Sequence, residues 1–151
     1  MCPEISARTL PHRTQIVHNS ARSLTSTAGN CPGETMADRL EDFQKFRADV
    51  NEEILGCGHL GIKRFFALDH QAYEPGPLGT KQKELLGLVA SAVLRCDDCI
   101  TYHLVRCAEE GWKREEVIDA LNVALIVGGS ITIPHVRRAF ARMREIKGLQ
   151  P

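Results

Sequence analysis

The feature that most constrains the fold of this chain is a nearly apolar segment close to its middle, residues 85–94. Thr80 can cap a helix that runs to about Leu94 and that has almost no polar face after its first turn. The apolar members of this helix are Leu85, Leu86, Leu88, Val89, Ala90, Ala92, Val93 and Leu94. A helix that is apolar nearly all round is buried on most sides, so we expect other helices and a second copy of the chain to cover it.

Glu84 is the last charged residue before this apolar segment and enters the protein interior with it. Burying an unpaired carboxylate costs several kcal/mol, so an isolated charge would be unstable there. We therefore expect a partner for the Glu84 carboxylate inside the fold.

Other segments of the chain after Met36 also have the apolar spacing of helices. Apolar residues recur at helical spacing over residues 37–54, 62–72, 113–127 and 136–146, and glycine or proline separates these segments. The run of residues 131–133 is too short for a convincing strand and is stopped by Pro134. The sequence therefore predicts an all-α fold built of antiparallel helix hairpins.

Directly after the apolar helix comes a pair of cysteines, Cys96 and Cys99, and His103 follows four residues later. In a helix, Cys99 and His103 lie one turn apart on the same face, close enough for a hydrogen bond. A neighbouring base favours the thiolate, a peroxide converts a thiolate into sulfenic acid, and a second thiol closes a disulfide. The pattern is typical of a small redox enzyme.

Physical reasoning alone leaves the identity of the attacking sulfur open. Cys96 lies near a helix N-terminus, which favours its thiolate, but Asp97 and Asp98 oppose that charge. Cys99 has the imidazole of His103 one turn away. Either cysteine can therefore be the nucleophile on this evidence.

Plain packing is another interpretation of cysteine, which is a small apolar residue that is often buried. It suits Cys57 and Cys107, which we expect in the interior. It does not suit the Cys96 and Cys99 pair, because the two aspartates between these cysteines require access to solvent. We therefore favour redox chemistry for the pair.

Zinc binding is the main alternative for the pair itself. Cys96, Cys99 and His103 could share an ion with Glu84, or with Cys57 and His59. A zinc ribbon is excluded because the chain has no second Cys-x-x-Cys pair. The alternative function is therefore a non-catalytic helical oligomer that binds zinc or a protein partner through this cluster.

Composition excludes several other classes of protein. The 151 residues include 19 basic and 19 acidic side chains, so no overall charge attracts nucleic acid. No apolar run reaches the ~18 residues that span a bilayer, so we expect no membrane partner. The first residues lack the apolar core of a secretory signal, which makes the cytoplasm the expected compartment. We expect no bound cofactor.

Residues 1–35 differ from the rest, because they have no periodic apolar pattern and are rich in hydroxyl side chains. We expect a disordered N-terminal extension there and one helical domain over residues 36–151. The arginines and few acids of the extension suggest a transit peptide. Met36 stands directly before the first helix, which favours the other interpretation, a functional start at Met36 with a dispensable extension before it.

Glu84, the Cys96-x-x-Cys99-x-x-x-His103 motif, and a Gly-Trp pair before a helix that ends in Gly-Gly together resemble the alkylhydroperoxidase D and carboxymuconolactone decarboxylase-like family. The resemblance covers roughly residues 43–143. It implies an all-helical fold that assembles into homo-oligomers, often trimers or hexamers. It also implies reduction of a small hydroperoxide by the cysteine pair, with a thiol or lipoyl-type protein as the reductant.

Position by position, the resemblance implies that Cys99 attacks the peroxide and that Cys96 is the resolving thiol. His103 would be the base, and Glu84 would hold or relay the proton. Asp98 stands where the alkylhydroperoxidase D proteins carry a second histidine, so we expect a shorter proton relay. The decarboxylase branch usually lacks the cysteine pair, which argues against lactone decarboxylation.

Overall fold

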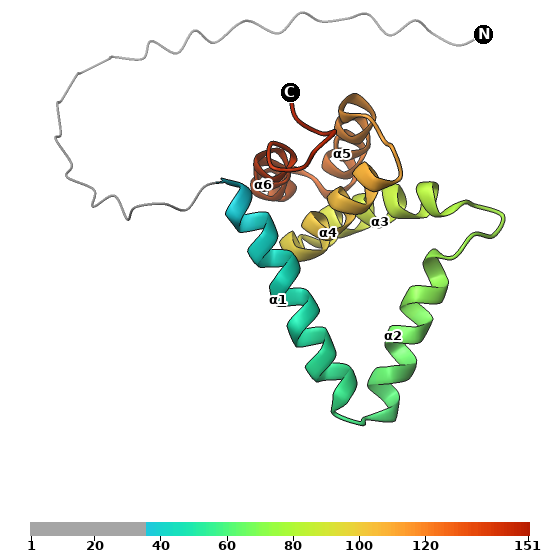
Figure 1. Cartoon of the computed structure of the whole chain (residues 1–151). Helices are drawn as coiled ribbons and strands as arrows, with labels where there is room; N and C mark the ends of the chain where they lie inside the picture. Colours follow the sequence, from blue (N-terminus) through green and yellow to red (C-terminus); the bar gives the residue numbers. More distant parts are fainter. Residues whose placement is uncertain (1–35) are drawn as a thin grey trace, which may run out of the picture. The chain divides into compact units, whose positions relative to one another are not determined.

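The computed structural model describes residues 36–151, and these residues form six α-helices and one short 3-10 turn, without a β-strand among them (Figure 1). The elements are α1 (Met36–Gly56), α2 (Leu60–Tyr73), α3 (Thr80–Leu94), α4 (Asp97–Glu109), α5 (Arg114–Gly128), η1 (Ser130–Thr132) and α6 (Ile133–Met143). The prediction of an all-α fold is confirmed. The expected N-terminal extension lies outside the described residues.

The core of the fold lies among α3, α4, α5 and α6. Helix α3 packs against α4 and α5, and α4 packs against α6. The buried apolar side chains of this core are Leu88, Ala92, Ile100, Leu104, Cys107, Val117, Leu121, Ala124, Ala139, Met143, Ile146 and Leu149. Cys107 is fully buried, as expected, and burial raises the pKa of its thiol to about 12. This cysteine is a packing residue.

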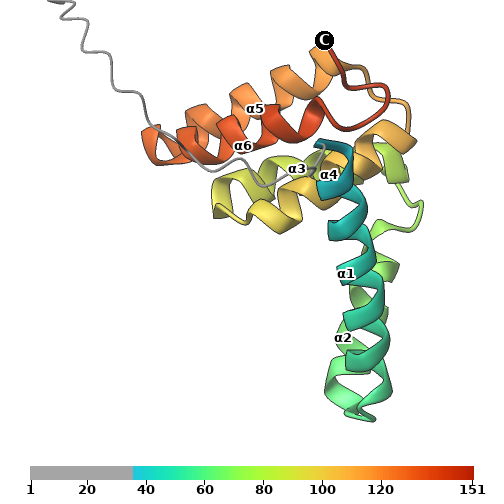
Figure 2. The same cartoon turned by 60° about the vertical axis from the view of Figure 1, so that its left-hand side comes forward.

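Helices α1 and α2 extend away from this core as an arm (Figures 1 and 2). No residue of α2 is buried, and Phe65 is 70% exposed. The expectation that Cys57 packs in the interior is wrong, because this residue lies in the turn between the two arm helices and is exposed.

Helix α3 is less enclosed than its sequence predicts. Glu84, Leu88, Ser91 and Ala92 are buried, whereas Leu86 and Leu94 are 57% and 75% exposed. The reason is that α4 and α5 cover one side of α3 within a single chain. Apolar side chains on α5 are exposed too, and Ile126 reaches 77%.

Thr80 does not cap α3 with its side chain. Gly79 is the N-cap residue, and the Thr80 hydroxyl donates a hydrogen bond to the Tyr73 carbonyl, 2.9 Å away. This contact ties the end of α2 to the start of α3.

None of the helices within residues 36–151 combines the length and the apolar character that a membrane span requires.

Candidate active site

The chain turns sharply from α3 into α4, and this turn places the cysteine pair. Arg95 adopts a left-handed conformation with φ of 62°, and the Cys96 amide donates a hydrogen bond to the Ser91 carbonyl at 3.1 Å. This pairing is a Schellman motif, which satisfies carbonyl groups at the end of a helix. Cys96 therefore ends α3 with its backbone and is the N-cap residue of α4.

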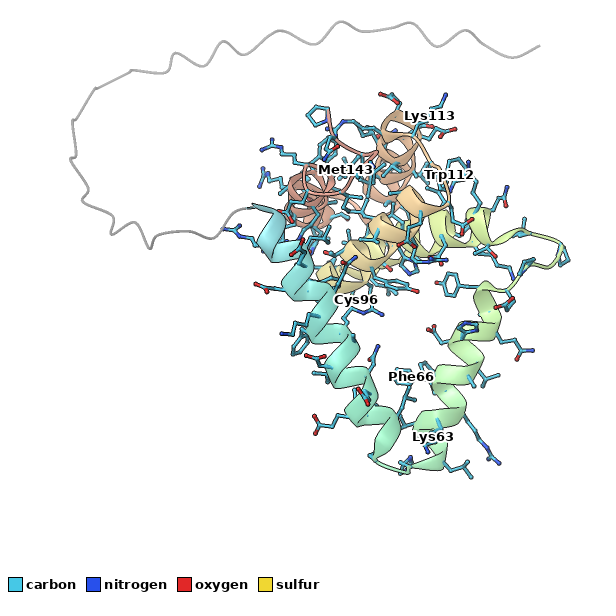
Figure 3. All side chains as sticks on the ribbon, viewed as in Figure 1. Lys63, Phe66, Cys96, Trp112, Lys113 and Met143 are labelled. Atoms are coloured by element: carbon cyan, nitrogen blue, oxygen red, sulfur yellow. A yellow bond between two sulfur atoms is a disulfide. The ribbon has the colours of Figure 1, made fainter. Side chains whose placement is uncertain are left out.

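Cys96 and Cys99 are joined by a disulfide, with their Cα atoms 5.3 Å apart. The Cys96 sulfur also accepts a hydrogen bond from the Cys99 amide, 3.3 Å away, so it caps the first turn of α4. Cys99 is exposed. Figure 3 shows Cys96 at the start of α4 and Trp112 just beyond the other end of this helix.

The partner expected for Glu84 is present in the structure. Glu84 is only 2% exposed, and its carboxylate Oε2 lies 2.8 Å from His103 Nδ1. Its other oxygen, Oε1, accepts a hydrogen bond from Arg106 Nε at 3.1 Å. This bond raises the pKa of the Arg106 guanidinium, which also contacts Glu109 and Glu110. The buried carboxylate is therefore bonded at both oxygens.

His103 is held from two sides. A carboxylate only accepts hydrogen bonds, so the Nδ1 atom of His103 carries the proton that faces Glu84. The second ring nitrogen, Nε2, lies 3.4 Å from the Tyr73 hydroxyl at the end of α2. Within residues 36–151, no hydrogen bond joins this ring to either sulfur of the disulfide. The structure thus brings Glu84 to His103 and Cys96 to Cys99, as two separate pairs.

Gly87 leaves the space that the imidazole occupies. A Cβ atom at this position would lie 2.5 Å from His103 Cε1 and 2.7 Å from the Tyr73 hydroxyl. Contacts under about 3 Å do not occur for real Cβ atoms, so any larger residue would displace these side chains. Glycine inside a helix is destabilising by roughly 0.5–1 kcal/mol relative to alanine, and here it allows α4 to bring His103 against α3.

A cleft of about 1190 Å³ lies between the arm and helices α3 and α4, and Glu84 and Arg106 line it. Tyr73 and Tyr102 line it as well, and Arg47 of α1 stacks over the Tyr102 ring at 4.1 Å. Burial raises the pKa of both phenols above 10.0, and the negative charge of Glu84 adds to this effect. Neither cysteine of the pair lines the cleft.

Three members of this cluster were not predicted from the sequence: Arg106, Tyr73 and Gly87. Arg106 follows His103 by three residues, so helical spacing places both on one face and could have indicated it. A glycine inside an otherwise apolar helix was a weaker signal at position 87. No local pattern connects Tyr73 with His103, because the two lie thirty residues apart.

The zinc alternative receives no geometric support within residues 36–151, since no three His, Cys, Asp or Glu side chains there are arranged to hold a metal ion. The side chains around His103 and the disulfide beside them have a different chemical capacity from metal binding. A buried carboxylate, an imidazole and a phenol in sequence can hold a proton, and the adjacent disulfide can carry two electrons.

Comparisons with known proteins identify relatives of this chain that share its fold. Two crystal structures of one Thermotoga maritima protein are 57% identical to this chain, with TM-scores of 0.68 and 0.67. These matches cover 70% and 69% of this chain, and 92% and 88% of that protein's chains. The Thermotoga protein is described as a carboxymuconolactone decarboxylase family protein, and a part in the antioxidative response has been suggested for it.

Two more distant relatives add to this picture. A carboxymuconolactone decarboxylase family protein from Legionella pneumophila is 21% identical with a TM-score of 0.63, over 76% of this chain and 99% of that one, and shows the common fold. A Paracoccus denitrificans sequence, uncharacterized protein 4 in the cox locus, is 29% identical over 84 residues, which are 56% of this chain and 76% of that protein.

The sequence model of one family matches residues 62–142, more than half of the chain, and this segment contains Glu84, Cys96, Cys99 and His103. The fold resemblance to the Thermotoga and Legionella proteins agrees with the match. The chain belongs to the carboxymuconolactone decarboxylase family.

Proposed function

We propose that this protein is a thiol-dependent oxidoreductase that reduces hydroperoxides through Cys96 and Cys99. The observation that carries the proposal is the disulfide at the start of α4, in which one of the two cysteines is exposed. The suggested antioxidative role of the Thermotoga relative supports the same class of reaction.

The proposed cycle has three steps. The Cys99 thiolate attacks a peroxide oxygen, the O–O bond breaks, and an alcohol leaves after taking up a proton. The Cys96 thiolate then attacks the Cys99 sulfur, so a disulfide forms and the sulfenic oxygen leaves as water. Two thiol molecules, or one lipoyl-type protein dithiol, return two electrons and two protons to the disulfide and are themselves oxidised to a disulfide. Such donors are abundant in a reducing compartment such as the cytoplasm.

In this proposal, His103 accepts the proton of the reduced Cys99 thiol, and Glu84 orients the imidazole. Glu84 binds Nδ1, which leaves Nε2 as the basic nitrogen. That nitrogen faces the Tyr73 hydroxyl in the disulfide form, where no thiol proton exists. The imidazole therefore has to exchange Tyr73 for the Cys99 thiol during the cycle. Arg106 offsets the negative charge of Glu84 throughout.

The test is mass spectrometry of the reduced, alkylated protein before and after one equivalent of an organic peroxide, with metal removed. We expect the loss of two thiols and a cross-linked peptide that contains Cys96 and Cys99. Cys57, which is exposed and forms no disulfide within residues 36–151, serves as the internal control, and we expect it to keep its thiol. Retention of free Cys96 and Cys99 after peroxide would contradict the proposal.

We also propose that the chain forms a homo-oligomer, a trimer or a hexamer, through the exposed apolar side chains of α3 and α5. This set includes Leu86, Leu94, Val123, Ile126 and Val127. Monomeric proteins rarely expose apolar patches of this kind, because covering them with a second copy is favourable.

Light scattering tests this assembly. Leu94→Lys together with Ile126→Lys should reduce the measured mass to that of one chain, because charges at a closed apolar interface are costly. Leu78→Lys is the matched control, since Leu78 is an exposed leucine in the loop before α3 and should leave the mass unchanged. A monomer mass for the unaltered protein at micromolar concentration would contradict the assembly.

A further inference from the structure

A second cluster of charged side chains lies directly beside the cysteine pair. Asp97, the first residue of α4, places its Oδ1 atom 2.8 Å from His135 Nδ1 and its Oδ2 atom 2.8 Å from Arg138 Nη1. Both partners belong to α6, and the His135 side chain is only 16% exposed. The redox mechanism described above does not use this cluster.

The charge of Asp97 matters because of its neighbour. Cys96 precedes Asp97 and caps α4 with its sulfur, where the partial positive charge of the helix end favours a thiolate. A carboxylate beside a thiolate has the opposite effect, because like charges disfavour ionisation. Asp97 would therefore reduce the reactivity of Cys96 if its charge were left uncompensated.

We propose that His135 and Arg138 are positioning residues for Cys96: they hold the Asp97 carboxylate toward α6 and offset its charge, so that Cys96 can react as a thiolate. The inference rests on the proposed redox function of the pair. It concerns the second chemical step, in which the Cys96 thiolate supplies the electron pair of the new S–S bond. His135 donates its Nδ1 proton to Asp97 whether the ring is neutral or charged.

Other charged groups lie near this position as well. A small pocket of about 220 Å³ beside Asp97 and Arg138 is lined by Arg39 of α1, Asp98 of α4, Arg142 of α6 and Glu145 just beyond it. Arg142 bonds to Glu145 at 2.9 Å rather than to Asp97. Arg142 therefore provides a matched control, an arginine of the same helix and the same pocket that does not bind the carboxylate.

The experiment uses the full chain with Cys99→Ser, which leaves Cys96 as a free thiol. The rate of iodoacetamide alkylation at Cys96 is followed by peptide mass spectrometry between about pH 5 and pH 10. We expect Arg138→Gln and His135→Ala each to slow alkylation near neutral pH by about threefold, and both together by about tenfold, with the midpoint of the profile moved to higher pH. Arg142→Gln should leave the profile unchanged.

The Asp97→Asn substitution tests whether His135 and Arg138 act on Cys96 through the Asp97 carboxylate. It should speed alkylation by itself, and in its presence His135→Ala and Arg138→Gln should have no further effect. An unchanged profile for both variants, or slowing that persists with Asp97→Asn, would overturn the inference. If His135→Ala does not fold, Arg138→Gln decides alone, since this side chain is 60% exposed.

A separate sample of the unaltered protein distinguishes this inference from the proposed function. Failure of the unaltered Cys96 and Cys99 pair to close in peroxide would contradict the peroxidase proposal. The effect of Arg138→Gln on Cys96 alkylation is measured without peroxide, so its result does not depend on the outcome of the peroxide test.

Discussion

The two ends of α4 carry cysteines in opposite environments. At its start, Cys99 is exposed and disulfide-bonded, and close to its end Cys107 is fully buried in the apolar core. Between them, His103 faces the buried Glu84. The contrast separates two kinds of chemistry along one helix. Under the proposed function, electrons would be exchanged at the exposed disulfide, where a partner molecule can reach it, and the proton would be held by the buried His103 and Glu84.

The largest expected effect concerns the exposed end. Cys99→Ser should abolish the reaction with peroxide, because the nucleophile is lost. Cys96→Ser should consume one equivalent and stop as a sulfenic acid at Cys99, since no resolving thiol remains. Dimedone labelling followed by peptide mass spectrometry measures both results. A dimedone adduct at Cys96 in the Cys99→Ser variant, at the full rate of the first turnover, would reverse the assignment.

The second effect compares Cys99 with Cys107 in reduced protein. Burial raises the pKa of the Cys107 thiol to about 12, so near pH 8 only about one molecule in ten thousand carries this thiolate. The Cys107 thiolate fraction increases as pH rises and becomes the major form only above the pKa. We expect alkylation of Cys99 within the first time points and none at Cys107 until denaturant is added. The exposed Cys57 is the control for reagent activity. Similar native rates at Cys99 and Cys107 would contradict the contrast.

The third effect concerns the buried Glu84 carboxylate of α3, which binds His103 in the middle of α4. Glu84→Gln removes the charge that binds His103 and Arg106. It should lower the free energy of unfolding by about 3 kcal/mol, because removing one partner of a buried ion pair is costly. Urea unfolding at fixed protein concentration measures the change. Glu109→Gln removes an exposed partner of the same Arg106 and should cost less than about 0.5 kcal/mol. Equal losses for the two variants would show that burial of the carboxylate does not matter.

The smallest effect concerns the space that Gly87 leaves for His103. Gly87→Ala gains up to about 1 kcal/mol in helix propensity but inserts a Cβ atom 2.5 Å from the imidazole, so we expect a net loss of about 1 kcal/mol. The same urea experiment measures it. Gly56→Ala is the matched control, because a Cβ atom added at the end of α1 meets nothing within 4 Å. A more stable Gly87→Ala variant would mean that His103 has room to move.

Helical periodicity was sufficient to predict the fold class and the course of α3, because a glycine before it and an apolar run within it mark both ends clearly. The cost of burying a charge was likewise enough to predict that Glu84 has a partner. Both conclusions depend on local pattern and on general energetics, which a single sequence contains.

Contacts between distant segments could not be predicted in the same way. Spacing places Cys99 and His103 on one side of α4, but it does not determine the direction of the ring, which faces Tyr73 from α2. The expectation for Cys57 was wrong because burial depends on which elements surround a turn. The apolar composition of α3 indicated burial, and the single chain covers only one side of it.

Cys96 makes one hydrogen bond with its backbone and one with its sulfur at the turn between α3 and α4, and the second of these reports the oxidation state of the cysteine pair. Its backbone amide donates a hydrogen bond to the Ser91 carbonyl of α3, while its sulfur accepts a hydrogen bond from the Cys99 amide of α4. A thiolate is a stronger acceptor than a disulfide sulfur, since it carries a full charge. The amide resonance of Cys99 in a nitrogen-15 spectrum therefore follows the oxidation state of the pair, and the amide resonance of Cys96 provides the nearby reference.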